Sequence, residues 1–349
     1  MRSVALFVLG TSFALIACGG SSSGGGSPGS GGSAASGGSS GSVSSGGASG
    51  GVTAGSGGAS GSGGVSGSGV SGGGGAGGVI TTSNGGACSG VNLTHTTTVL
   101  TAPATADLAS PTLSPDELEM LYAVGLPSAT PPQDTWTIHR ATRVSRATAF
   151  DTDIEVPELD AACPGSNRRD PTLSSDGLSV YIVCEAPDAD NLLTGPLRRA
   201  TRANRDAPWA VDATDFGTVG TSPSITGDQL TLWTSSIATG QAAPSLFTRA
   251  SIAAPFTNST ASINVPQAST PDISADGTLL FGADASKLLL SKRNASGSFD
   301  VINPDLLARA TVLPVGSPTQ SADCGSLYFI EIDTLPTAAT VWTISVATP

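Results

Sequence analysis

The stretch "SPTLSPDELEMLYA" (residues 110–123) recurs four more times in this chain, with proline, turn and apolar residues in the same order. The other copies are "DPTLSSDGLSVYIV" (170–183), "SPSITGDQLTLWTS" (222–235), "TPDISADGTLLFGA" (270–283) and "SPTQSADCGSLYFI" (317–330). Successive prolines, from Pro111 to Pro318, are 60, 52, 48 and 47 residues apart. This period is typical of the blades of a β-propeller.

Each copy is typical of two strands joined by a tight turn. The Asp that lies five residues after each proline can bond the backbone of the turn, and Gly177 and Gly277 tolerate a positive φ there. Glu117, Gln229 and Cys324 replace that glycine in the other copies. The second strand carries adjacent large apolar residues, so both of its faces must be covered, as in a blade stacked between two others.

A second similarity supplies two further strands per repeat. The motifs are "TIHRATR" (137–143), "PLRRATR" (196–202), "SLFTRAS" (245–251) and "LLLSKRN" (288–294), each followed by an aromatic residue six or seven positions after an arginine. The last repeat ends after its third strand, and residues 92–102, where threonine alternates with apolar residues, can supply the fourth. The sequence therefore predicts an all-β propeller of five four-stranded blades closed by an N-terminal strand, with six blades as the alternative.

The phrases "SPTLSPDE" and "TPDISADGTLLF" resemble the Pro-Asp, WD40-like repeats of TolB-type β-propellers, over roughly residues 92–349. The resemblance implies the propeller fold and a binding role, since members of that family mostly bind proteins or have no assigned role. TolB-type propellers usually have six blades, which departs from the five repeats counted here.

Residues 1–17 have the features of an export signal: a positive start, an apolar run too short to span a membrane, and small residues at its end. The following "LIAC" (residues 15–18) resembles a bacterial lipobox, which implies that Cys18 is lipid-modified and becomes the mature N-terminus. The alternative is a conventional signal peptide, with Cys18 incidental. Gly19, in place of Asp, favours the outer membrane or cell surface in Gram-negative species.

Residues 18–87 are almost wholly Gly, Ser, Ala and Val without a charge, which predicts a disordered linker ahead of a propeller domain at 88–349. After the signal, 14 Lys and Arg remain against 27 Asp and Glu. An acidic chain disfavours nucleic acid and anionic membrane surfaces as partners. We therefore expect a monomer held to a membrane by its lipid alone.

Four cysteines follow Cys18, an even number that is compatible with two disulfides in an exported protein. In the blade arrangement, Cys88 precedes the closing strand and Cys324 lies in a turn of the same blade. Cys163 precedes the first strand of the second blade, and Cys184 ends its second strand. This predicts the pairs Cys88–Cys324 and Cys163–Cys184; four unpaired buried thiols are the alternative.

The sequence contains no recognisable catalytic constellation. Its two histidines, His95 and His139, have no metal-ligating neighbours at suitable spacing, so neither a metal nor a cofactor is predicted. No Gly-x-Ser-x-Gly elbow adjoins a strand-to-helix turn. We therefore expect that the chain is not an enzyme.

Ligand binding is predicted instead at four residues. Arg168 and Arg169 break the repeat on the loop expected to enter the second blade, and Asp170 follows them. Asp272 is the other acid expected near the central channel. The sequence thus favours a lipoprotein of the cell envelope whose propeller binds a protein or a glycan. The alternative is a cell-surface carbohydrate-active enzyme that uses channel carboxylates.

Overall fold

The computed structural model describes residues 93, 95–103, 105–126, 135–187, 193–236, 243–259, 269–284, 287–307, 315–323, 325–334 and 340–348. The chain divides into two units, Met1–Val79 and Ile80–Pro349, and every described residue belongs to the second. The expected signal peptide and linker, including Cys18, lie outside the described residues. Across the described ranges, no helix is long and apolar enough to cross a membrane.

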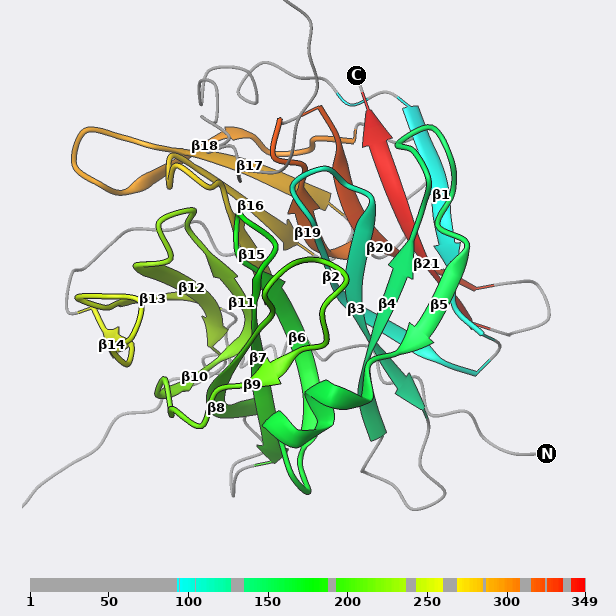
Figure 1. Cartoon of the computed structure of the whole chain (residues 1–349). Coiled ribbons are helices and arrows are strands. Elements are labelled where there is room, and N and C mark those ends of the chain that lie inside the picture. The colour runs from blue at the N-terminus through cyan, green and yellow to red at the C-terminus, as the bar shows by residue number, and fades with distance from the viewer. Residues whose placement is uncertain are drawn as a thin grey trace, which may run out of the picture. The chain divides into compact units, whose positions relative to one another are not determined.

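The second unit is an all-β, five-bladed propeller of antiparallel sheets (Figure 1). Blade 1 consists of β2 (Asp107–Leu113), β3 (Glu119–Leu126), β4 (Thr135–Thr142) and β5 (Thr152–Glu155). Blade 2 consists of β6 (Asn167–Leu173), β7 (Ser179–Pro187) and β8 (Leu193–Thr201), with β9 (Ala210–Val211) and β10 (Thr218–Val219) at its outer edge. Blade 3 consists of β11 (Thr221–Ile225), β12 (Thr231–Ser236), β13 (Ala243–Thr248) and β14 (Thr257–Asn258).

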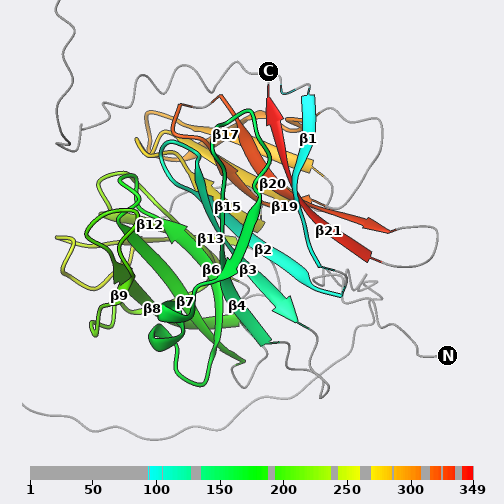
Figure 2. The same cartoon turned by 45° about the vertical axis from the view of Figure 1, so that its right-hand side comes forward.

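The last two blades complete the ring. Blade 4 consists of β15 (Ser269–Ile273), β16 (Leu279–Asp284), β17 (Lys287–Arg293) and β18 (Phe299–Asn303). Blade 5 consists of β19 (Val315–Gln320), β20 (Leu327–Thr334), β21 (Thr340–Thr348) and β1 (His95–Thr101). The N-terminal strand β1 lies beside the C-terminal strand β21, with Leu100 opposite Ile344 (Figure 2). The predicted five blades and their closure by an N-terminal strand are confirmed.

The turn between the first two strands has the structure that its aspartate predicts. In blade 2, the Ser174 hydroxyl donates to Asp176 Oδ1 at 2.5 Å, and the Leu178 N–H donates to the same oxygen at 2.9 Å. Blades 1, 3 and 4 repeat this pattern at Asp116, Asp228 and Asp276. The repeated acids therefore stabilise turns, as a side chain that bonds its own local backbone does.

Blade 2 differs from the expected pattern at its outer edge. The sequence predicts a single fourth strand opened by the aromatic residue that follows Arg202, but β9 and β10 are two short segments that both pair with β8. Asp212 and Asp215 accept hydrogen bonds from the backbone of Thr214 and Gly217, which turns the chain between the two segments. Local side-chain bonds of this kind compete with a continuous strand.

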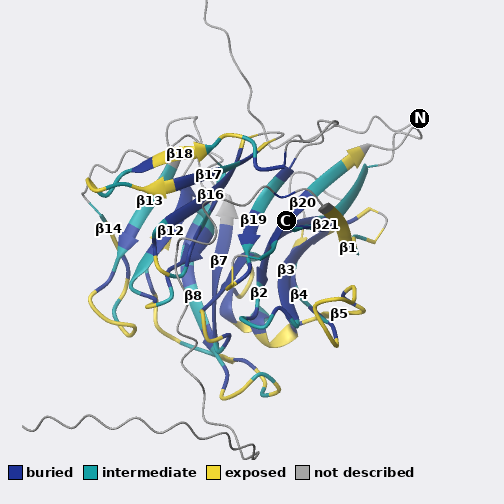
Figure 3. Ribbon diagram, turned by 90° about the horizontal axis from the view of Figure 1, so that it is seen from above, coloured by how far each residue is buried: buried dark blue, intermediate teal, exposed yellow. Residues whose placement is uncertain are grey.

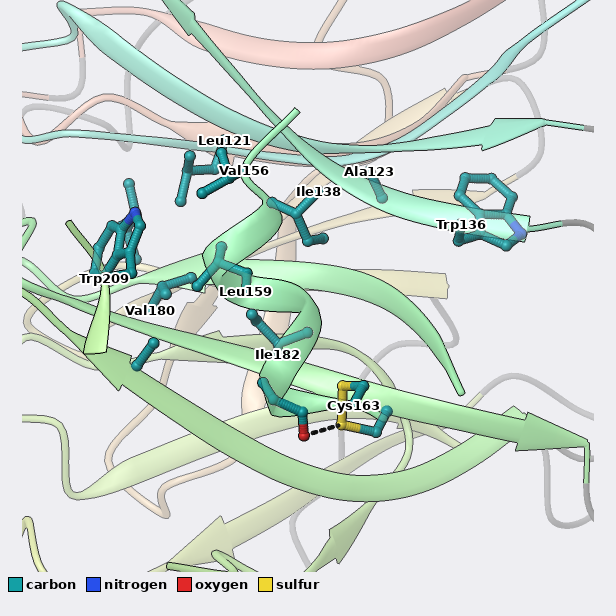
Figure 4. Close-up of a cluster of buried hydrophobic side chains, with 14 of the residues drawn as sticks. Leu121, Ala123, Trp136, Ile138, Val156, Leu159, Cys163, Val180, Ile182 and Trp209 are labelled. Carbon is teal, nitrogen blue, oxygen red and sulfur yellow. Dashed lines mark hydrogen bonds between the residues drawn. A yellow bond between two sulfur atoms is a disulfide. The ribbon is translucent and has the colours of Figure 1, made fainter. Parts of the chain in front are cut away.

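The hydrophobic core lies between neighbouring blades. Figure 3 shows buried residues concentrated in inner strands such as β3 and β7, with exposed residues on outer strands such as β5 and β18. Between blades 1 and 2, Ile138, Leu159 and Ile182 are fully buried (Figure 4). Leu159 belongs to η2 (Pro157–Ala162), a short 3₁₀ helix in the loop that enters blade 2.

The same figure shows the predicted Cys163–Cys184 disulfide, which is present and ties the end of this loop to β7. Its sulfur atoms are buried in the core between blades 1 and 2. A covalent link between residues 21 positions apart stabilises the folded state, by about 3 kcal/mol in the loop-closure account. The predicted partners Cys88 and Cys324 lie outside the described residues.

A buried polar network joins blade 5 to blade 1. Arg143 Nη2 donates to the Tyr328 hydroxyl at 2.6 Å, and that hydroxyl donates to Glu117 Oε2 at 2.7 Å. The side chains of Arg143 and Glu117 are 2% and 1% exposed. Glu117 occupies the turn position with a φ of 61°, where glycine was expected. In this conformation the carboxylate of Glu117 accepts the hydrogen bond from Tyr328 of the neighbouring blade 5.

Replacing Arg143 with Met should destabilise the propeller by about 3 kcal/mol. This value is at the lower end of the stability loss expected when a buried ion pair is broken. We choose the lower end because Arg146, 3.2 Å from Glu117, still offsets part of its charge. Arg293→Met is the matched control in blade 4, where the side chain is exposed and the loss should stay within about 0.5 kcal/mol. Urea denaturation measures both, and equal losses would contradict the structural role of this network.

Candidate functional site

The five first strands share one unusual backbone feature. In each, the residue before the repeated proline has a positive φ of 45–53°. These five residues, the pre-proline ring, are Ser110, Asp170, Ser222, Thr270 and Ser317. The pairing register of each first strand slips at this point. Each strand therefore carries a β-bulge, where proline is tolerated because no ladder hydrogen bond is required of it.

The residues after the prolines form a second ring. Its members, the post-proline ring, are Thr112, Thr172, Ser224, Asp272 and Thr319. One cavity at the centre of the propeller is lined by four members of this ring, all but Ser224, together with the five prolines and four members of the pre-proline ring. The cavity volume is about 30 Å³, enough for a water molecule but far below the size of a sugar ring.

Post-proline side chains connect one blade to the next. The Thr112 hydroxyl accepts a hydrogen bond from the Leu173 N–H at 3.0 Å, and the Ser224 hydroxyl accepts one from the Ile273 N–H at 2.9 Å. These bonds satisfy backbone donors that the bulges leave without a partner in their own sheet. The hydroxyls of Thr112 and Ser224 therefore have a structural role.

Asp272 is the one carboxylic acid in the post-proline ring. Its Oδ2 accepts from the Gln320 N–H of blade 5 at 3.0 Å, and its Oδ1 accepts from the Ser224 hydroxyl of blade 3 at 2.8 Å. Part of the residue lines the channel, but its carboxyl group lies deep among neighbouring atoms. Burial raises the pKa of Asp272 to about 7, against the two hydrogen bonds that favour the ionised form.

Asp170 is the one acid in the pre-proline ring, and it is 2% exposed. The Ser110 hydroxyl of blade 1 donates to its Oδ1, and the Ser222 N–H of blade 3 donates to its Oδ2 at 2.8 Å. Asp170 is not among the residues that line the channel cavity. It bridges two blades beside the channel, and Asp272 faces the channel itself.

Arg169 and Glu185 form an ion pair next to Asp170. Arg169 Nη1 lies 3.5 Å from Glu185 Oε2, and the guanidinium carbon lies 4.3 Å from the centre of the Trp136 ring. Glu185 is 3% exposed. Burial raises the pKa of Glu185 to about 7, the charge of Asp170 adds to the increase, and the charge of Arg169 opposes it.

The structure brings three of the four predicted ligand residues together around β11. Asp170 contacts Ser222 and Asp272 contacts Ser224, which lie two residues apart on that strand. Arg169 adjoins Asp170 in β6. The prediction that Arg168 and Arg169 lie on a loop was wrong, because β6 begins at Asn167 and pairs Arg168 with Cys184. The side chain of Arg168 lies outside the described residues.

Glu185 is the member of this cluster that the sequence analysis missed. The repeat does contain a signal for it, because the corresponding positions in blades 1 and 5 carry Gly125 and Ile332. A buried acid in place of a small or apolar residue departs from the repeat. Over the described ranges, no group of three or more His, Cys, Asp or Glu residues is arranged to hold a metal ion.

No protein-family model matches the sequence, and no curated protein matches it. Among solved structures, a family 117 glycoside hydrolase of Zobellia galactanivorans is 13% identical, with a TM-score of 0.49 over 72% of this chain and 89% of that one. A GH43_1 enzyme of Xanthomonas citri, complexed with xylotriose, is 12% identical, with a TM-score of 0.49 over 70% and 89%. TolB of Acinetobacter baumannii is 12% identical, with a TM-score of 0.36 over 69% and 54%.

This comparison corrects the expectation that the chain is not an enzyme. The similar propellers include a family 117 glycoside hydrolase, a GH43_1 enzyme, a β-xylosidase and a GH62 α-L-arabinofuranosidase, so the absence of a recognisable motif is no ground for excluding catalysis. At sequence identities of 9–13%, the similarity concerns the fold alone and assigns no activity to this chain. The activity has to be argued from the site.

The raised pKa of Asp272 predicts a specific pH dependence of stability. Between about pH 4 and pH 7 the folded chain holds a proton that the unfolded chain has lost, so this group makes folding less favourable as pH rises through that window. Asp272→Asn removes the titration. We expect the variant to gain up to about 4 kcal/mol relative to the wild type between pH 4 and pH 8, from about three pKa units at 1.36 kcal/mol each.

Asp276→Asn is the matched control, because hydrogen bonds in its turn lower the pKa of Asp276 despite burial. Its stability difference from the wild type should stay constant between pH 5 and pH 8, since the group is ionised throughout in both states. Urea denaturation at each pH gives both differences. A constant difference for Asp272→Asn as well would show that Asp272 titrates normally.

Proposed function

We propose that the chain is an exported carbohydrate-active enzyme whose chemistry is centred on Asp272 in the propeller channel. One observation carries the proposal. Asp272, whose pKa burial raises to about 7, lines the channel in part and holds a ring position where the other four blades carry hydroxyls. Such a group gives up and takes up protons near neutral pH, which is what acid–base catalysis requires.

Glycoside hydrolysis ordinarily uses a pair of carboxyl groups. Asp170 is the candidate for the second, because both acids meet β11, one at Ser222 and the other at Ser224. The channel cavity can hold a water molecule against Asp272, but it cannot hold a sugar ring. The glycan would therefore lie across the mouth of the channel, with the reacting water at its centre.

The chemistry of the channel favours an uncharged glycan. Serine and threonine hydroxyls form most of its polar lining, and these groups match sugar hydroxyls as hydrogen-bond partners. The chain has a formal net charge of −12, which repels polyanionic polysaccharides. The substrate class we propose is a neutral polysaccharide.

The test is activity on neutral polysaccharides such as xylan, arabinan and galactan, with polygalacturonate as the anionic comparison. Wild-type protein should release reducing sugar from a neutral member of the set. Asp272→Asn should lower kcat at least about 100-fold, the scale of a lost acid–base group. Asp276→Asn, in an outer turn, should retain wild-type activity. Binding to a polysaccharide without release of sugar would overturn the proposal in favour of a binding module.

We also propose that the propeller is held at the cell envelope by a lipid on Cys18, with residues 19–87 as its tether. The support is the position of "LIAC" after an apolar export signal, and the absence of charge from the segment that follows.

Intact mass of the protein extracted from its native membrane tests the anchor. We expect a diacyl or triacyl mass for a chain that begins at Cys18, and recovery of a Cys18→Ser variant in the soluble fraction. Cys163→Ser is the control, because it removes a cysteine without touching the signal. An unacylated wild-type chain would contradict the anchor and leave the propeller chemistry untouched.

A further inference from the structure

Blade 2 departs from the repeat at three adjoining positions. Where it has Arg169, blades 1, 3, 4 and 5 have Ala109, Thr221, Ser269 and Gly316. Asp170 replaces a serine or threonine, and Glu185 stands where blades 1 and 5 have Gly125 and Ile332. A repeat fold needs none of these charges, since the other blades form the same strands without them.

The Arg169–Glu185 pair is poorly suited to a purely stabilising role. Its side chains are 13% and 3% exposed, and their closest contact is 3.5 Å. Among the described residues, Arg169 Nε and Glu185 Oε1 are buried without a hydrogen-bond partner. A buried ion pair with unsatisfied atoms loses more in desolvation than a well-packed apolar pair would, so its retention needs a different reason.

A continuous set of contacts runs from this pair to the channel acid. Glu185 contacts Arg169, which precedes Asp170 in β6. The Asp170 carboxylate accepts from the Ser222 N–H, and two residues further along β11 the Ser224 hydroxyl donates to Asp272. Trp136 lies against the guanidinium of Arg169 and restricts its position from blade 1.

We propose that Arg169 and Glu185 are positioning residues for the Asp170 carboxylate, which they hold in its bridge between blades 1 and 3. The inference rests on the proposed function, because it assigns these residues a role at the same site. Asp170 fixes β11, and β11 carries the serine that orients Asp272. The pair, with Arg169 on the first strand of blade 2 and Glu185 on the second, thus controls the geometry of Asp170 and, through β11, of Asp272.

The electrostatics of the pair make the proposal measurable without a substrate. Asp170 and Asp107 are the other charged groups that act on it: Asp170 raises the pKa of Glu185, and Asp107 acts on Arg169. Because burial already brings the pKa of Glu185 to about 7, its titration falls in an accessible range. The pKa of Glu185 therefore reports whether the charges of Arg169 and Asp170 lie close to its carboxyl group.

The experiment is a ¹³C NMR titration of the Glu185 carboxyl group in the full propeller. The wild type should titrate near pH 7. Asp170→Asn should lower the midpoint by at least about half a unit, because a like charge is removed, and Arg169→Met should raise it, because an opposite charge is removed. Arg169→Lys should stay closer to the wild type than Arg169→Met and serves as the variant most certain to fold. Unchanged midpoints in all three variants would overturn the proposal.

A second measurement separates positioning from simple stabilisation. On a polysaccharide that the wild type hydrolyses, Glu185→Gln should shift the pH–rate profile near neutral pH, and Arg169→Lys should largely restore the profile that Arg169→Met alters. If these variants are less stable but have an unchanged pH–rate profile, Arg169 and Glu185 only stabilise the fold and do not position Asp170. If the wild type hydrolyses nothing, the proposed function fails, while the Glu185 titration still decides whether the pair holds Asp170.

Discussion

The propeller depends on hydrogen bonds that pass from the first strand of one blade to the first strand of the next. Every first strand has a proline at a bulge, and in blades 1, 3 and 4 the residue after it accepts a hydrogen bond from the backbone of the following blade. Because buried backbone donors need partners, these side chains must be acceptors. A threonine satisfies that requirement in blade 1, a serine in blade 3, and an aspartate in blade 4 at Asp272. The candidate chemistry therefore occupies a position that the fold already requires to be polar.

A second constraint joins the blades further from the channel. Tyr181 donates to Gln229 in blade 3, and Tyr328 donates to Glu117 in blade 1, with an arginine beside each tyrosine. Blade 1 has Leu121 at the position of these tyrosines, and the turn of blade 2 that follows it has Gly177. The turn residue and the aromatic residue thus match across each of these interfaces. At these two interfaces the buried carboxylate or amide of the turn accepts a hydrogen bond from the hydroxyl opposite it, so neither group is left without a partner.

Much of this fold could be predicted from the sequence, because a repeated phrase reports the same strand, turn and strand five times. The closing strand followed from counting strands, and the Cys163–Cys184 disulfide followed from the blade arrangement. Glu117 and Gln229 looked like departures from the turn pattern because their partners, Tyr328 and Tyr181, are distant in the sequence. Their role as hydrogen-bond acceptors for these tyrosines is visible only once the neighbouring blades are in contact.

The site was less predictable than the fold. Asp170 and Asp272 were identified as acids on or entering first strands near the expected channel, but only the structure shows that Asp272 lines the cavity and Asp170 does not. Glu185 was missed although it departs from the repeat, because its burial beside Arg169 becomes visible only in the folded blade. The expectation that the chain is not an enzyme rested on the absence of a local motif, and the glycoside hydrolases among the similar propellers contradict it.

We have proposed that Asp272 is a proton-exchanging group of the channel and not a substitute for a serine in the hydrogen-bond ring. A ¹³C NMR titration of its own carboxyl carbon in the folded protein distinguishes the two. We expect a midpoint near pH 7, because burial raises the pKa of this carboxyl group. A midpoint near pH 4, the ordinary value for aspartate, would mean that Asp272 stays ionised and serves only as an acceptor between blades.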